Sequence, residues 1–195
     1  MAKAVSHFFM DDILKNTQLA FDEVNALSKT DLTKEDVLSL MISGYRLGVK
    51  NTGLMLGYDV EADIEDMYEA LFVLIDGKTW EDRYDEHKEN DDADGMSNLV
   101  RSEYHRVYAR GGEDGADKVS SATGLGINKT WNTMLDDRVR DTHEYLEGMT
   151  IPKEDDFWTY DGDHAPAPGG FFDVQNNAGC RCILTYSFDN GQGRP

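Results

Sequence analysis

Apolar residues recur at helical spacing through the first part of the chain, and this periodicity predicts three helices near residues 5–27, 33–52 and 59–76. The second is the best marked, because Thr33 is a preferred N-cap residue and an acidic first turn follows it. Residues 1–75 are therefore expected to form a helical N-terminal region. The apolar face of the third helix, which we expect to be buried, consists of Ile64, Met67, Tyr68, Leu71, Phe72 and Ile75.

Charged and glycine-rich segments separate the next two predicted helices. A short helix over residues 79–88 precedes the acidic run 89–95, whose mutual repulsion indicates a mobile loop or a contact for a basic partner. A longer helix is expected to begin at Ser97. Gly111 and Gly112 favour either the end of this helix or a kink, since apolar residues at helical spacing continue beyond them.

The pattern changes after Asn128, where apolar and polar residues begin to alternate. Residues 129–135 are predicted to form a strand, because alternation places Trp131, Thr133 and Leu135 on one side.

A further helix is expected over residues 138–147. Asp136 or Asp137 would cap its start, and Gly148 would end it. His143 lies on the apolar face of this helix, so we expect its ring to point towards the core.

The last part of the chain combines a long loop with a closing strand. Residues 149–152 are expected to be extended, residues 155–178 form a loop rich in Pro, Gly and Asp, and residues 181–188 form a strand. Together the elements predict an α+β fold: a helical N-terminal half, then a small antiparallel sheet with one packed helix and a long ordered loop. Five aromatic residues of the loop indicate either a lid over the sheet or a surface that binds a neighbouring chain: Phe157, Trp158, Tyr160, Phe171 and Phe172.

The composition is strongly acidic, with 38 acidic against 19 basic residues and a net charge of −19. Such a charge repels a phosphate backbone, so we expect no strong DNA binding by the chain itself. A basic protein partner, or simple solubility, explains the charge better. No apolar run is long enough to span a bilayer and the start shows no secretory leader, so no membrane contact is expected.

The two cysteines offer three interpretations. Cys180 and Cys182 would point to the same side of an extended segment, so their thiolates could bind one Zn²⁺ with His143, and with His164 or an Asp as the fourth ligand. Alternatively, His143 is a neutral core residue bonded to a carbonyl or carboxylate, and no cofactor is bound. A disulfide is disfavoured, because Cα atoms two residues apart on a strand lie about 6.5 Å from each other. So few cysteines fit a reducing cytoplasm.

Segments 131–143, 146–148 and 177–182 combine a tryptophan, an Asp-Asp-Arg sequence, a histidine and a closing Cys-Arg-Cys. This combination resembles the carboxy-terminal signature of the phage Mu F-like head morphogenesis family, whose members are minor head proteins. The segment around Arg101 and Glu103 is similar to the helix with that family's Arg-Thr-Glu motif. The resemblance implies a structural motif made of Arg101, Glu103, Trp131, Asp136, Asp137, Arg138, Arg140, His143, Gly148, Cys180, Arg181 and Cys182.

The resemblance also implies a role. Residues 76–190 would form the head morphogenesis module and residues 191–195 a flexible tail. The protein would assemble in the host cytoplasm and reside in the virion, in the capsid interior or at the portal vertex. It would act in head morphogenesis and DNA packaging or ejection by docking to the portal protein and/or the major capsid or scaffold protein, without catalysis. Some relatives have Cys-x-x-Cys where this chain has Arg140 and His143, so Arg140 replaces one candidate metal ligand.

Two other function classes remain open. ADP-ribosyltransferase domains are sometimes fused to this family, and an Arg101 and Glu103 pair invites that comparison. The two side chains face different directions on a helix, however, so an ion pair between Arg101 and an acid elsewhere is the structural alternative. The other class is a small zinc-stabilised binding module, and for a nucleic-acid ligand the net charge opposes it.

Overall fold

The computed structural model describes residues 7–189, without the side chains of residues 7–9 and 174. The predicted start of the first helix at residue 5 and the predicted tail 191–195 lie outside the described residues. The helices are α1 (His7–Leu27), α2 (Lys34–Met55), α3 (Ile64–Leu71), α4 (Trp80–Glu89), α5 (Ala93–Thr123), α6 (Asp141–Glu144) and α7 (Val174–Asn177). The strands are β1 (Ile127–Asn132), β2 (Thr150–Pro152), β3 (Phe157–Trp158), β4 (His164–Ala165) and β5 (Ile183–Phe188).

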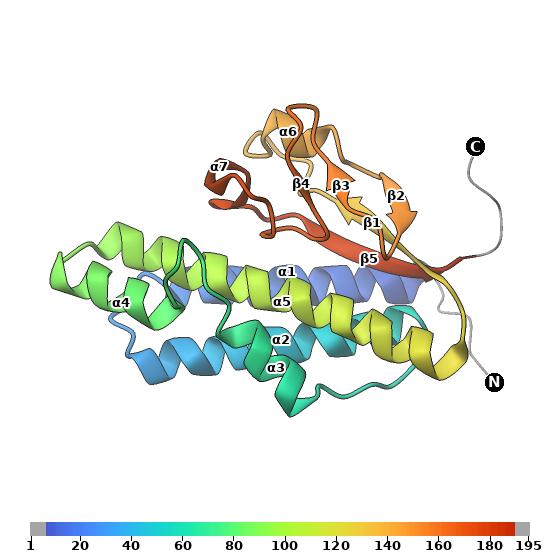
Figure 1. The fold of residues 1–195 in the computed structure, drawn as a ribbon, viewed down its shortest axis with the longest axis horizontal. Helices are drawn as coiled ribbons and strands as arrows, with labels where there is room; N and C mark the ends of the chain where they lie inside the picture. Colours follow the sequence, from blue (N-terminus) through green and yellow to red (C-terminus); the bar gives the residue numbers. More distant parts are fainter. Residues whose placement is uncertain (1–6, 190–195) are drawn as a thin grey trace.

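The long helices form one layer, in which α2 and α5 run side by side along the molecule (Figure 1). Glycines let their backbones approach closely. A Cβ atom on Gly48 would lie 2.1 Å from the Tyr108 carbonyl oxygen, and one on Gly111 would lie 2.2 Å from that of Tyr45. α5 runs through Gly111 and Gly112 without ending, so of the two alternatives the continuation beyond these glycines is correct, and a helix end at this point is wrong because the glycines serve helix packing.

The helix α3 is shorter and more exposed than the sequence predicts. It spans Ile64–Leu71 in place of residues 59–76, and its buried residues are Met67, Ala70 and Leu71. Two turns of helix reach their neighbours along one narrow side only, so the adjacent side stays in solvent. The expected buried residues on that adjacent side are exposed: Ile64, Tyr68 and Phe72.

The acidic run 89–95 is mostly not a loop, which corrects the expectation of a mobile hinge. α4 and α5 are joined by residues 90–92 alone. Asp92 caps α5 by accepting a hydrogen bond from the Gly95 backbone N–H at 2.8 Å. Glu89 is the last residue of α4, and Asp94 lies in the first turn of α5, where negative charge is favourable. The short helix predicted over residues 79–88 is confirmed as α4.

Three strands form an antiparallel sheet in the order β2-β1-β5, and β3 and β4 form a separate hairpin. In the register of β1 and β5, Trp131 lies opposite Leu184 and Lys129 opposite Tyr186. β5 lies against the layer of long helices, and the rest of the sheet and α6 lie beyond it (Figure 1). This arrangement confirms the α+β fold.

The strand β1 ends earlier than predicted. After Asn132 the Thr133 backbone N–H donates to the Glu147 carboxylate at 2.6 Å, so it does not continue the ladder. Leu135 has a φ of 52° and is 77% exposed, so its predicted place in the strand, on the same side as Trp131, is wrong.

The helix predicted over residues 138–147 is reduced to one turn, α6. Asp136 does not cap it. Its carboxylate instead accepts from the Arg138 backbone N–H at 3.2 Å and binds the Arg181 guanidinium at 2.9 Å. Gly148 follows the turn in the left-handed conformation, with a φ of 70°, and leads the chain into β2.

Candidate functional site

The Cys-Arg-Cys segment converges on His143. The Nδ1 atom of His143 lies 3.5 Å from the Cys180 sulfur and 3.4 Å from the Cys182 sulfur. The ligand atoms of all three residues lie within 4.8 Å of one another. His143 belongs to α6 and the cysteines directly precede β5, so segments 37 and 39 residues apart in sequence meet here. The closing strand is thereby folded back against the α6 segment.

Aromatic rings enclose this cluster. The His143 ring stacks on Phe171 and meets Trp131 edge on, with 5.3 Å between ring centroids in both pairs. His143 is 1% exposed and Cys182 is 3% exposed. Among the described residues, no carbonyl or carboxylate is bonded to His143, and its Nε2 atom has no hydrogen-bond partner. The ring therefore points into the core as predicted, but the carbonyl or carboxylate bond expected of a neutral core histidine is not present.

The two thiols differ in their pKa. A hydrogen bond from Cys182, together with the nearby guanidinium groups of Arg140 and Arg181, holds the pKa of Cys180 below its usual value. The same hydrogen bond and burial raise the pKa of Cys182. Cys180 therefore becomes a thiolate more readily than Cys182. Both cysteines are free in this arrangement.

The arginines of the motif fasten the segments that hold the cluster. Arg140 donates to the carbonyl oxygens of Asn176 and Ala178, which lie just before the cysteines. Arg181 binds both carboxylate oxygens of Asp136. The guanidinium of Arg140 therefore acts on the backbone of the cysteine segment, although its position in the sequence is that of a candidate ligand.

The structure does not bring His164 into the cluster. Its Nδ1 atom contacts the Asp156 carboxylate at 2.7 Å, and its ring stacks on Trp158. The side chain is 49% exposed. His164 is therefore not the fourth ligand in this arrangement, because the β3–β4 hairpin holds it on the surface.

Asp163 organises the long loop, although no sequence pattern distinguishes it from the neighbouring acids. Its carboxylate accepts from the backbone N–H groups of Phe172 and Asp173 at 3.2 and 3.1 Å, and from the Asn176 side-chain amide at 2.9 Å. One acid among many in an Asp-rich segment carries no distinguishing signal. Only the folded loop shows that this one binds four donors, of which the fourth is the His164 backbone N–H at 2.9 Å.

The ion pair expected at Arg101 is found at Glu103 instead. Glu103 is 1% exposed, and its carboxylate binds Arg83 at 2.8 Å and Arg106 at 2.7 Å. Arg101 donates to the Asn25 and Asn98 side chains. The two motif residues therefore face different neighbours, as their helical spacing predicts.

The aromatic residues of the long loop divide into two groups. Phe157 and Phe171 are buried and pack into the core below the loop. Trp158, Tyr160 and Phe172 are 57%, 62% and 98% exposed. The buried pair fits the lid interpretation, and binding of a neighbouring chain by the exposed three stays a prediction.

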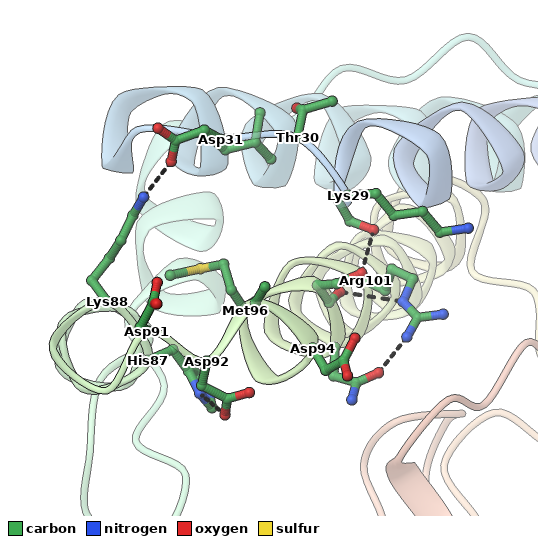
Figure 2. A pocket seen from close by; sticks show the side chains of 15 residues that line it. Lys29, Thr30, Asp31, His87, Lys88, Asp91, Asp92, Asp94, Met96 and Arg101 are labelled. Carbon is green, nitrogen blue, oxygen red and sulfur yellow. Dashed lines mark hydrogen bonds and ion pairs between the residues drawn. The ribbon is translucent and has the colours of Figure 1, made fainter.

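A hollow of about 670 Å³ lies at one end of the helical layer, between the α1–α2 connection and the start of α5 (Figure 2). Its charged lining is largely paired within the protein. Lys88 binds Asp31, the His87 ring contacts Asp92, and Arg101 donates to a neighbouring backbone carbonyl and amide. These contacts connect α4 to the α1–α2 connection and to the residue that caps α5.

Comparisons with known proteins support the family resemblance that the sequence motif indicated. The model of the family described as Phage Mu protein F like protein matches residues 66–185. Minor head protein GP7 of Bacillus phage SPP1 is 33% identical to this chain over 90 residues, which cover 46% of this chain and 29% of that protein. The chain thus spans less than a third of that relative's length. No solved structure shows a significant match.

Within residues 7–189, no helix combines the length and the apolar character needed to cross a bilayer. The family match includes α5, β1, β2, the first half of β5 and all three residues of the histidine–cysteine cluster. Since this match covers more than half of the sequence, the chain belongs to the Phage Mu protein F like family.

Proposed function

We propose that this protein is a minor head protein that acts in phage head morphogenesis by docking to another head component. Its family and its similarity to a phage minor head protein support the assembly role. The observation that carries the docking mechanism is a row of exposed apolar side chains on α3 and the segment after it. We call this row the α3 stripe, and it consists of Ile64, Tyr68, Phe72, Val73 and Leu74.

The α3 stripe is a continuous apolar surface. Ile64, Tyr68 and Phe72 follow one another at intervals of four residues and so lie along one side of the helix. The rings of Tyr68 and Phe72 stack, with centroids 6.0 Å apart. Every residue of the stripe is at least 38% exposed. Contiguous exposed apolar side chains of this kind mark interaction sites.

The helix beneath the stripe is fixed to the body of the protein. Arg106 of α5 donates to the Ala70 carbonyl oxygen at 2.7 Å, near the end of α3. Lys118 of α5 pairs with Asp66 at 3.3 Å. Because the surface is already ordered, binding to it costs less conformational entropy than binding to a loose segment would.

The charge around the stripe defines the chemistry of the partner. Lys78, the cation of this segment, is already paired with Glu86 at 2.6 Å. The partner should therefore present apolar side chains ringed by Lys and Arg, and we assign this surface to the portal protein. The exposed acids that surround the stripe are Glu61, Asp63, Glu65, Glu69 and Asp76.

The same charge separates docking from DNA binding. A chain with a net charge of −19 gains nothing from a phosphate backbone, so packaged DNA would lie near the protein without being bound strongly by it. A position in the capsid interior at the portal vertex would let the protein influence packaging or ejection through protein contacts, without a catalytic step.

Co-expression with the portal protein of the same phage, followed by size-exclusion chromatography, tests this proposal. Wild-type chain should co-elute with the portal protein, and added salt should weaken the complex. The double variant Tyr68→Ser/Phe72→Ser should elute alone. Leu19→Ser is the matched control, because Leu19 is a 57% exposed apolar residue on α1. Co-elution of the double variant at the wild-type level, or co-elution with only the major capsid or scaffold protein, would contradict the assignment.

A further inference from the structure

We infer that His143, Cys180 and Cys182 form a Zn²⁺ site that fastens the closing strand to α6. The inference is independent of the docking proposal, because the cluster is buried and the α3 stripe lies on another element.

The distances within the cluster match tetrahedral zinc geometry. Zinc binds cysteine sulfur at about 2.3 Å and histidine nitrogen at about 2.0–2.1 Å, so a tetrahedral arrangement places nitrogen and sulfur about 3.5 Å apart. His143 Nδ1 lies 3.5 and 3.4 Å from the sulfur atoms of Cys180 and Cys182. One ion placed between the three atoms would reach all of them without a change of fold.

The burial of the cluster is a second argument for a bound metal. Three polar groups meet beside the aromatic rings of Trp131 and Phe171, where burying a polar group without a strong partner is energetically costly. The only hydrogen-bond contacts of the His143 ring among the described residues are with two thiols, which are weak donors and acceptors. A bound cation would satisfy the ring nitrogen and both sulfurs together.

The donor set selects the metal. Two thiolates and an imidazole are soft to intermediate ligands, which favour zinc over magnesium or calcium. Binding releases the thiol protons and leaves a Zn²⁺ with two thiolates, so the site has no net charge. The nearby cations Arg140 and Arg181 are then not repelled, and both are already bound to carbonyl or carboxylate oxygens.

The fourth position has room for water and little more. A small hollow of about 10 Å³ adjoins the cluster, lined also by Met134, Arg138, Val139 and Gly179. This volume corresponds to about one water molecule. Its lining has no carboxylate and no second histidine. A water ligand completes the tetrahedron, and a space of this size leaves no room for a substrate beside the metal.

Metal analysis of the purified full-length chain tests the site. We expect one zinc per chain by inductively coupled plasma mass spectrometry, and a lower melting temperature after removal by a chelator that is restored by added Zn²⁺. His143→Gln and Cys182→Ser should lose the metal. His164→Gln, at an exposed histidine, should retain it.

Cobalt substitution of the wild-type protein tests the metal site even if the ligand variants fail to fold. Wild-type protein loaded with Co²⁺ should show the intense visible bands of a tetrahedral ion and sulfur-to-cobalt charge transfer in the near ultraviolet. Octahedral cobalt spectra, a melting temperature that neither chelator nor Zn²⁺ changes, or a Cys180–Cys182 disulfide in freshly purified protein would overturn the inference.

Discussion

The helix α5 meets α2 and the sheet by different kinds of contact. Towards α2 the two backbones nearly touch, and a Cβ atom on Gly48 or Gly111 would collide with a carbonyl oxygen of the other helix. Towards the sheet, polar groups meet: the Tyr186 hydroxyl donates to Glu113 at 2.7 Å, and the Lys129 ammonium lies 3.4 Å from the same carboxylate. The α2–α5 contact therefore depends on the absence of side-chain volume at its glycines. The contact between α5 and the sheet depends on the pairing of buried charges.

The charged pair at the sheet is deeply buried. Lys129 has no exposed surface, and its ammonium also donates to the Pro166 carbonyl oxygen at 2.7 Å. Burial raises the pKa of Glu113 and lowers the pKa of Lys129, which means that each charge depends on the other. Such a pair contributes little net stability compared with an apolar replacement, but it is costly to break from one side.

Replacing Lys129 with Met should therefore have the largest effect on stability. The substitution leaves the buried Glu113 carboxylate with the Tyr186 hydroxyl as donor but without the ammonium group, and it removes the donor to the Pro166 carbonyl oxygen. We expect a loss of about 3–5 kcal/mol in the free energy of unfolding, measured by urea denaturation.

The double variant Lys129→Met/Glu113→Gln is the control for this prediction. It removes both charges, so it should recover a substantial part of the loss. A single variant that loses less than about 1 kcal/mol would mean that the pair behaves like an exposed ion pair and that the contact does not depend on charge pairing.

Gly48→Ala tests the other side of α5. Alanine gains about 1 kcal/mol of helix propensity over glycine, but overpacking a tight contact usually costs about 1–3 kcal/mol or more. Because the colliding atom is the Tyr108 carbonyl oxygen in the backbone, we expect a net loss of about 1–2 kcal/mol. Lys50→Ala, at an exposed position of the same helix, should stay near wild type. A more stable Gly48→Ala variant would show that the helices separate easily.

Asp136→Asn should have the smallest effect on stability, and the effect should be visible mainly as a change in how stability depends on pH. The Arg181 guanidinium holds the pKa of Asp136 well below its usual range. An acid whose folded-state pKa is depressed adds stability above its unfolded pKa of about 4, and this contribution is lost as the pH falls further. The urea midpoint of the variant should therefore be lower than wild type near neutral pH and fall less between about pH 5 and about pH 3. Asp137→Asn, at the exposed neighbouring acid, should behave like wild type.

The sequence predicts the α2–α5 side of the molecule better than the sheet side. Apolar periodicity and capping residues gave α2 and α4 nearly correctly, since helical spacing and N-caps are local signals. The role of Gly111 was missed, because a glycine that permits close helix packing has the same local pattern as one that ends a helix.

The candidate site was predictable in its parts. The Cys-x-Cys spacing and the apolar face of His143 indicated that these residues meet, and they do. The pairing of Lys129 with Glu113 and the contacts of Asp163 with residues 172–176 were not predictable, because they join segments that are distant in sequence and give no local pattern. The exposed side of α3 was mistaken for core, since periodicity shows which residues share a side of a helix and not what covers it.

Docking through the α3 stripe is tested most directly by the amount of this protein in purified phage heads. Heads would be produced with the wild-type chain, with Tyr68→Ser/Phe72→Ser, or with Leu19→Ser, and the copies per head counted by quantitative mass spectrometry. We expect the wild-type chain and Leu19→Ser at equal copy number and the double variant strongly depleted, with its melting temperature unchanged. Retention of a folded double variant at the wild-type copy number would contradict docking through the α3 stripe.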